Sequence, residues 1–503
     1  MCEHCSGISR RTFMGATGAL SSGLIFTGLA ASQETSPPMP NDEWNENQPP
    51  VRIYVVFVGS RYPGWPRAEF DCPGEIEQVY NPCLKAVGEK FGDVEFIGGD
   101  LISNGDEANK LLTQFEEQNA DAVLVVHLTL GTPATFSALA SSGLPVGIFA
   151  QLFSGHQWIY FPEIQRNAAT KLIVRASGNL KDVEELVALL RVPSKMRNAK
   201  LLMICNPGCA AGTAAARDYA NVKEKFGTEV IPITPQEFVE VHQTISEFEA
   251  VEEAEEYWIS KARDIWEPSR EEIIKSCKTY FAMKKLMNTH NTRTISMKCL
   301  GGVPIDILGY PCLGFSRIMD DGGIGTCEAD MDSTLTMMMF MYATGKPGFI
   351  SDPLMDFPNN AVIHAHCVSA TKMAGPQTER LPFIIRAHLE DGKGASLKVF
   401  VDRDMDHPVT MCKLANNDTI LASSAKLKGS CDSPERGCRT QMVTEVTSST
   451  ALELYDKWGG NILGNDMMTL LHRVLFYGDH LETFHDIARL MGLRFMVEGK
   501  DWA

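Results

Sequence analysis

Four polar residues in the second half of the chain have the types and surroundings of a metal site: Glu328, Asp352, His366 and His472. Glu328 follows a glycine-rich stretch in GIGTCEADMDSTLT, and Asp352 lies 24 residues later in KPGFISDPLMDF. His366 lies in AVIHAHC, and His472 lies in LLHRVLFYGDH near the C-terminus. Carboxylate and imidazole ligands suit Mn²⁺, Mg²⁺ or another first-row divalent ion. The sequence therefore predicts a metal site built from these side chains.

Two carboxylates around one divalent ion could move a proton between neighbouring carbons of an aldose. This chemistry needs an acid/base group on each side of the C1–C2 edge, and it needs a charge that stabilises the enediolate. Removing a comparable electrostatic donor costs roughly 10²–10³ in rate. Glu328 and Asp352 are far enough apart in the sequence to come from different elements, and at strand ends they could flank one ion.

Each of the four residues also has an ordinary structural explanation. A Glu after a glycine-rich turn, such as Glu328, is favoured at a helix N-terminus by the helix dipole. Asp352 precedes Pro353, and Asp is a common turn residue. A histidine in an apolar run, such as His366 or His472, is more often a hydrogen-bonded core residue. Because the spacings match no short zinc signature such as HExxH, the pattern alone leaves both explanations open.

The elements that must position these residues follow a simple order along the 503-residue chain. Buried strand-like runs such as 51–59 alternate with helix-like stretches such as 75–91, which predicts a doubly wound α/β domain with a parallel sheet. A similar pattern starts again at 200–205. From Phe383 to about Val446 the residues alternate between turns, which predicts antiparallel β structure. The predicted fold class is α/β, with two doubly wound α/β domains followed by a β-rich, barrel-like C-terminal domain.

The predicted division of the chain follows from these patterns. It comprises a signal peptide at 1–31, a linker at 32–50, an N-terminal α/β domain at 51–195, a central α/β domain carrying the acidic metal ligands at 196–375, and a β-rich domain with a final helix at 376–503. A helix-like stretch at 237–263 belongs to the central domain.

The N-terminus has the pattern of an export signal. Arg10 and Arg11 form a twin-arginine string, and the apolar run that follows ends with Ala30 and Ala31. This pattern predicts Tat export of a folded protein to the periplasm or another extracytoplasmic place. The alternative is a fortuitous Arg-Arg before a membrane anchor. No other segment is long and apolar enough to span a bilayer, so we expect no stable membrane insertion after cleavage.

The net charge bears on the class of binding partner, and the cysteines bear on the role of disulfides. The formal net charge of −17 argues against a nucleic-acid partner, because such proteins present basic surface, and it is compatible with a neutral sugar. Of the fourteen cysteines, Cys2 and Cys5 lie in the predicted signal. A fold completed before export argues against dependence on disulfides, so the others are expected to be mostly buried small hydrophobic residues.

The strings GTCEAD, VIHAHC and LHRVLFYGDHLETFHDIARLMGL resemble, in order and spacing, the L-fucose/L-arabinose isomerase family. The resemblance implies a metal-dependent aldose–ketose isomerase, an intramolecular oxidoreductase that uses Mn²⁺ or another divalent cation and acts on a sugar of the L-fucose/L-arabinose type. Glu328 and Asp352 would be metal ligands and catalytic acid/base groups, and His472 a metal ligand. His366 would be the additional metal histidine of the arabinose branch, with His364 as its competitor.

Two further features come from the same resemblance. Ser351 stands where the arabinose branch carries its second acid, so the assignment to Asp352 follows the spacing of the fucose branch. The segment AQLFSGHQWIYFP resembles an active-site stretch of the arabinose branch, which places His156 near the substrate and allows this contact to cross a subunit boundary. The family commonly forms trimers or hexamers, so a homo-oligomer is implied.

Two other functions remain open from the sequence. The first is an exported, non-catalytic sugar-binding protein, because two α/β domains with a cleft are also the architecture of periplasmic binding proteins. Retention of all four polar ligands counts against it, since a buried carboxylate cluster is costly without a cation. The second is a metal-dependent hydrolase, which would need an open coordination position and an activated water. Nothing in the sequence separately favours the hydrolase.

Overall fold

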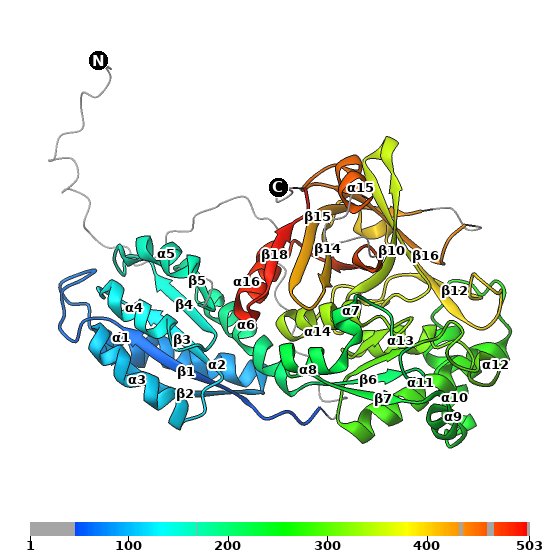
Figure 1. The fold of residues 1–503 in the computed structure, drawn as a ribbon, viewed down its shortest axis with the longest axis horizontal. Helices are drawn as coiled ribbons and strands as arrows, with labels where there is room; N and C mark the ends of the chain where they lie inside the picture. The colour runs from blue at the N-terminus through cyan, green and yellow to red at the C-terminus, as the bar shows by residue number, and fades with distance from the viewer. Residues whose placement is uncertain (1–45, 168–169, 432–435, 460–466, 500–503) are drawn as a thin grey trace, which may run out of the picture. The chain divides into compact units, whose positions relative to one another are not determined.

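The computed structural model of the protein describes residues 46–167, 170–431, 436–459 and 467–499. Two parallel sheets are followed along the chain by a six-stranded antiparallel barrel, which confirms the predicted fold class (Figure 1). The predicted signal peptide and most of the predicted linker lie outside the described residues. Across the described ranges, no helix has both the length and the apolar character needed to cross a bilayer.

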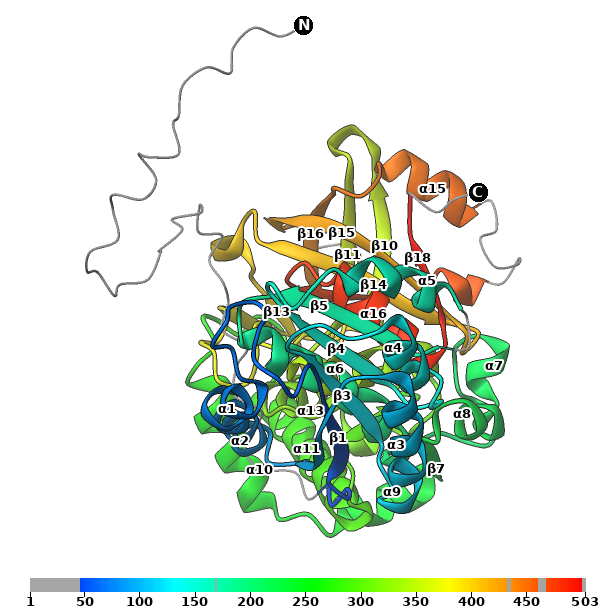
Figure 2. The ribbon, with the colours of Figure 1, turned by 90° about the vertical axis from the view of Figure 1, so that its left-hand side faces the viewer.

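The first sheet has five parallel strands in the order β2-β1-β3-β4-β5, and Figure 2 shows β1, β3, β4 and β5 side by side. The bounds of the strands are β1 (Val51–Val58), β2 (Val94–Ile102), β3 (Ala122–His127), β4 (Val146–Gln151) and β5 (Leu172–Ser177). The central strands β1 and β3 are almost continuously buried, because helices cover both faces of the sheet.

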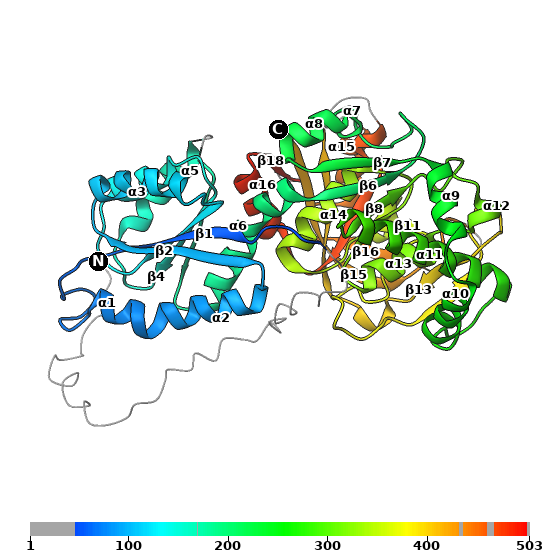
Figure 3. The same ribbon diagram turned by 90° about the horizontal axis from the view of Figure 1, so that it is seen from below.

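Successive side chains of β1 serve two different cores. Val55 and Phe57 pack in the core that includes helices α2 and α6, whereas Val56 and Val58 pack with α3, α4 and α5. Figure 3 shows α2 on one side of this sheet and α3 and α5 on the other. This alternation is the period-two geometry of a strand. The helices are α1 (Cys72–Glu75), α2 (Asn81–Phe91), α3 (Gly105–Glu117), α4 (Pro133–Ala140), α5 (Phe161–Arg166) and α6 (Lys181–Asn198).

The second sheet has four parallel strands in the order β7-β6-β8-β9. Its strands are β6 (Lys200–Ile204), β7 (Glu229–Ile233), β8 (Thr294–Met297) and β9 (Ile324–Thr326). Its helices are α7 (Ala214–Arg217), α8 (Tyr219–Phe226), α9 (Pro235–Gln243), α10 (Glu247–Glu253), α11 (Arg270–His290), α12 (Ile305–Leu308), α13 (Cys312–Asp320) and α14 (Met331–Thr344).

The helix-like stretch at 237–263 is not one helix. It contains most of α9, all of α10 and a π-helical segment at Ala254–Ile259. The break follows α9, where the Thr244 hydroxyl donates a hydrogen bond of 2.6 Å to the Val241 carbonyl. A side chain that bonds back to the last turn in this way competes with continuation of the helix.

The barrel closes through the strand order β14-β17-β10-β11-β16-β15, with β15 pairing back to β14. Its strands are β10 (Phe349–Asp356), β11 (Ala361–His366), β14 (Pro408–Ala415), β15 (Thr419–Ser430), β16 (Thr440–Val446) and β17 (Arg473–Tyr477). A separate hairpin pairs β12 (Phe383–Arg386) with β13 (Ser396–Val399), and β18 (Arg494–Val497) adds to β15. The remaining helices are α15 (Ala451–Gly459) and α16 (Leu481–Met491).

Antiparallel structure begins earlier than the sequence predicts. The pattern changes at Phe383, but β10 and β11 already pair antiparallel from Asp352 onward. Pro353 lies inside β10, and proline within a run weakens the sequence pattern of a strand. The consequence matters for the site, because β10 and β11 carry two of its predicted residues.

Candidate metal centre

Glu328 lies on a strained turn just beyond the carboxyl end of β9. Glu328 and Ala329 have φ values of 60° and 57°, in the left-handed region that residues other than glycine seldom adopt. The turn is held from two sides, because the Ala329 amide donates to the Met297 carbonyl (3.0 Å) and the Ala329 carbonyl accepts from the Ala211 amide (2.9 Å). Strain of this kind persists where the surroundings over-determine it, often at functional sites.

The other three predicted ligands come from neighbouring strands of the barrel. Asp352 lies in β10, His366 ends β11, and His472 directly precedes β17. His472 Nε2 lies 3.4 Å from Asp352 Oδ1 and 3.6 Å from Glu328 Oε2. His366 Nε2 lies 3.6 Å from Glu328 Oε1. Ligand atoms of Asp352, His366 and His472 all lie within 4.8 Å of one another, so the structure brings the four side chains together.

The site is buried on its imidazole side and more open on its carboxylate side. The side chains of His366 and His472 are 3% and 4% exposed, whereas those of Glu328 and Asp352 are 25% and 37% exposed. Burial opposes ionisation of Glu328, but the interactions with His366 and His472 outweigh it and lower the pKa of Glu328 to about 2. Burial likewise opposes protonation of His366, but Glu328 and Asp352 raise the pKa of His366 to about 9. Because the two carboxylates are the more exposed side chains of the site, substrate access is expected from their side.

The hydrogen bonding of His366 fits a bound cation. Both ring nitrogens of His366 are buried and have no hydrogen-bond partner among the described residues. A buried unsatisfied polar group costs on the order of 1–3 kcal/mol, which coordination of an ion would offset. The competing residue, His364, is already engaged, because its Nδ1 lies 2.8 Å from Ser351 Oγ and burial lowers the pKa of His364 to about 3. The buried histidines and adjacent carboxylates could therefore hold a metal ion, without specifying which.

Asp330 contacts the candidate site, and its sequence surroundings did not single it out. It is fully buried, and His472 Nδ1–H donates to Asp330 Oδ2 at 2.9 Å. That bond orients the ring so that Nε2 faces the carboxylates, as partners of metal-bound histidines commonly do. Asp330 is also the N-cap of α14, where it accepts from the Ser333 amide. The available sequence signal was an N-cap acid three residues before a serine at the start of an apolar helix.

A buried lysine supports the same histidine from the barrel. Lys413 of β14 donates to the Leu471 carbonyl at 2.8 Å, directly before His472 in the chain. Lys413 Nζ also lies 3.6 Å from Asp332 Oδ2, and both side chains are fully buried. Despite burial, the charge of Lys413 and the bond from His472 hold the pKa of Asp330 well below its usual range. Lys413 therefore links β14, α14 and the segment that carries His472.

His156 lies at a different place, in the loop after β4. It is exposed and, among the described residues, belongs to no group that could hold a metal ion. Large exposed apolar side chains lie on both sides of His156 in the chain. Others lie in the loops that follow the neighbouring strands β1 and β3. We call them the apolar edge, and its members are Tyr62, Trp65, Leu130, Leu152, Phe153, Trp158, Ile159 and Tyr160.

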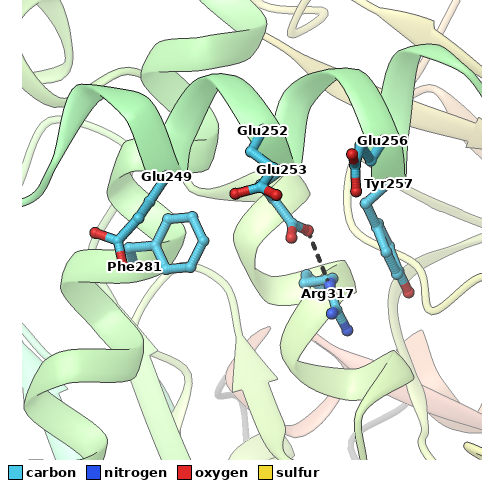
Figure 4. Close-up of a pocket in the computed structure, with 7 residues that line it drawn as sticks. All are labelled: Glu249, Glu252, Glu253, Glu256, Tyr257, Phe281 and Arg317. Carbon is cyan, nitrogen blue, oxygen red and sulfur yellow. Dashed lines mark hydrogen bonds and ion pairs between the residues drawn. The ribbon is translucent and has the colours of Figure 1, made fainter.

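A separate concavity of about 480 Å³ lies along α10 and the π-helical segment (Figure 4). It is lined by Glu249, Glu252, Glu253, Glu256, Tyr257, Phe281 and Arg317. Arg317 already donates to Glu253 at 2.9 Å and lies over the Tyr257 ring at 3.8 Å. None of the lining residues belongs to the metal site, and we assign no ligand to this acidic surface.

Comparison with known proteins supports a sugar-isomerase relationship at a distance. No protein-family model matches the chain. Two curated proteins, the sulfoquinovose isomerases of Priestia aryabhattai and of Priestia megaterium (strain ATCC 12872 / QMB1551), are each 26% identical over 227 residues. The match covers 43% of this chain and 46% of each relative, so the chain spans about half the length of the curated relatives it matches. The chain is thus distantly and partially similar to a sugar isomerase.

Among solved structures, an ABC transporter solute binding protein from Burkholderia multivorans aligns with this chain at 9% identity and a TM-score of 0.19. The alignment covers 59% of this chain and 93% of that chain. Likeness at this level carries no argument about fold or function.

Proposed function

We propose that the protein is a metal-dependent aldose–ketose isomerase. The observation that carries the proposal is the convergence of two carboxylates and two histidines from two parts of the fold. Glu328 comes from the edge of the second parallel sheet, and Asp352, His366 and His472 come from the barrel. The distant similarity to a sugar isomerase supports the same reaction class.

The proposed reaction moves the C2 proton of an aldose to C1 and the O2 hydroxyl proton to O1. Glu328 and Asp352 approach the same nitrogen, His472 Nε2, at 3.6 and 3.4 Å, so two proton-transfer groups are available around one point. Glu328 is ionised at neutral pH, as a carboxylate that accepts a proton must be, and its histidine neighbours lower its pKa further, to about 2. A divalent ion held by these residues, with Mn²⁺ proposed first, would polarise the carbonyl and stabilise the developing charge.

The substrate we propose is a sugar of the L-fucose/L-arabinose type. The name of the curated relatives adds sulfoquinovose to the sugars that should be screened. We also propose export through the Tat pathway, supported by the twin-arginine string at Arg10 and Arg11. We also propose a homo-oligomer, which the exposed apolar side chains of the apolar edge support, because such side chains gather at interaction sites. That His156 reaches the substrate across a subunit boundary is proposed from the family resemblance alone.

The experiment that tests the proposal measures metal per folded chain after dialysis against excess Mn²⁺, followed by ketose formation from a panel of aldoses. We expect about one ion in the wild type, far less in Glu328→Gln, and an unchanged content in Glu240→Gln, which alters an exposed glutamate on α9. Metal-dependent ketose formation would support isomerase activity. Sugar binding without metal in any variant would instead favour the non-catalytic sugar-binding protein.

A further inference from the structure

The metal centre has a thiol on one side. Cys327 directly precedes Glu328 and is buried at the carboxyl edge of β9. Its Sγ atom, a Glu328 carboxylate oxygen and a His366 ring nitrogen all lie within 4.8 Å of one another. This group is different from the Asp352, His366 and His472 group, although the two groups share His366.

We propose that Cys327, Glu328 and His366 form a second position for a divalent ion, selective for thiophilic metals such as Zn²⁺, Cd²⁺ and Co²⁺. Thiolate is a soft ligand that favours these ions, whereas carboxylate and water suit Mg²⁺ and Mn²⁺. A Cys sulfur, a His nitrogen and a Glu oxygen are each ligand types that zinc accepts. The same centre therefore offers a harder position on the Asp352 and His472 side and a softer one on the Cys327 side.

His366 provides the independent observation for this position. It is nine-tenths or more buried, and neither Nδ1 nor Nε2 has a hydrogen-bond partner among the described residues. Its Nε2 lies 3.6 Å from Glu328 Oε1, beyond hydrogen-bond distance, so the ring can coordinate an ion held by either group. Because His366 belongs to both groups and Glu328 contacts both histidines, the two positions compete for the same ligands.

A second sulfur lies next to the proposed ligand. Cys299 Sγ is 3.0 Å from Cys327 Sγ, and Cys299 follows β8, the parallel neighbour of β9. On binding, the Cys327 thiol would give its proton to solvent and form a thiolate–metal bond, with no change of oxidation state. Cys299 would remain a thiol that can donate a weak hydrogen bond to the coordinated sulfur.

If the protein is the proposed isomerase, occupation of this second position would also affect catalysis. An ion on the Cys327 side would use Glu328 and His366 and leave Asp352 and His472 without a metal. Thiophilic ions should therefore inhibit the Mn²⁺-loaded enzyme, and Cys327→Ser should reduce that inhibition. The existence of the second position can be tested without turnover.

The test is a titration of the metal-free full-length protein with Co²⁺, followed by absorption spectroscopy and by metal content per chain. Thiolate ligation gives an intense near-ultraviolet charge-transfer band that oxygen and nitrogen ligands do not give. We expect the band in the wild type and in Cys277→Ser, a matched change at a buried thiol on α11. We expect the band to be lost in Cys327→Ser while Co²⁺ still binds through the remaining ligands. In the wild type, Zn²⁺ should displace Co²⁺ and remove the band.

The outcomes separate the two proposals. Co²⁺ binding without the band in the wild type, or a band that persists in Cys327→Ser, would overturn the thiophilic position while leaving the isomerase site intact. Absence of any bound Co²⁺ or Mn²⁺ in the wild type would overturn both. Thermal unfolding and circular dichroism of each variant exclude misfolding as the cause of a lost band.

Discussion

The carboxyl edges of the two parallel sheets have the same strand order but carry different side chains. In both sheets the first strand lies between its second and third, and such edges are where open α/β sheets bind ligands. The edge of the first sheet presents His156 among exposed aromatic side chains, of which Phe153 is 75% exposed and Trp158 is 54% exposed. The edge of the second sheet presents Cys327 and Glu328 to the histidines of the barrel.

The difference shows that the sheet alone does not make the site. Glu328 becomes part of a ligand set only because β10, β11 and β17 place Asp352, His366 and His472 around it. The first edge receives no such strands from the described part of its own chain. We therefore interpret the second edge as the place of chemistry and the first edge as a surface for association.

The largest effect is expected at the second edge, from Asp352→Asn. Loss of one positioned acid/base group costs roughly 10²–10⁴-fold in rate. Folding should be largely unaffected, because the Asp352 side chain is 37% exposed and asparagine keeps an oxygen that can approach His472 Nε2, which lies 3.4 Å from Asp352 Oδ1. The measurement is kcat for ketose formation with Mn²⁺ saturating. A matched change at the first edge, Glu163→Gln on α5, should leave kcat unchanged; equal losses in both variants would contradict the comparison.

A smaller effect is expected from Asp330→Asn, which keeps the shape of the side chain that orients His472. Outer partners of metal-bound histidines typically contribute roughly 10–100-fold in metal affinity. We therefore expect a fall of that order in Mn²⁺ affinity by competition with a chelating dye, with much of the activity recovered at high Mn²⁺. Asp306→Asn, which changes an 88% exposed side chain on α12, is the control. Unaltered affinity in Asp330→Asn would remove this residue from the centre.

At the first edge, we expect a substitution to change the pH dependence of the free energy of unfolding rather than the catalytic rate. His127 ends β3, and burial lowers the pKa of His127 to about 4 in the folded protein. The unfolded chain protonates this histidine near pH 6.5, so stability falls as the pH drops from about 6.5 to 4. Linkage predicts a loss of about 2 kcal/mol between pH 7 and pH 5. Urea unfolding of His127→Gln should show less of this pH dependence, whereas exposed His156→Gln should match the wild type.

The four candidate ligands could be named from local patterns and from the family resemblance, and the structure brings them together. Glu328, Asp352, His366 and His472 flank turns or apolar runs, and continuous apolar runs at 51–59 and 200–205 predicted the strands β1 and β6. The supporting residues depend on distant pairings instead. Lys413 lies in an alternating run and is buried only because β14 pairs with β15 and β17 when the barrel closes. Asp330 resembles an ordinary helix cap until His472, 142 residues away, contacts it.

The smallest effect, and the one that most directly probes the first edge, is expected from Trp158→Ser. Truncating a tryptophan at an interface commonly costs on the order of 2 kcal/mol, which is enough to shift an assembly toward smaller species at micromolar concentration. Sedimentation should show this shift for Trp158→Ser but not for Trp266→Ser, a similarly exposed tryptophan outside the apolar edge. If His156 reaches the substrate across a subunit boundary, kcat should fall in proportion to the dissociated fraction while Mn²⁺ content stays constant. A monomer that retains full activity would leave the second edge sufficient by itself.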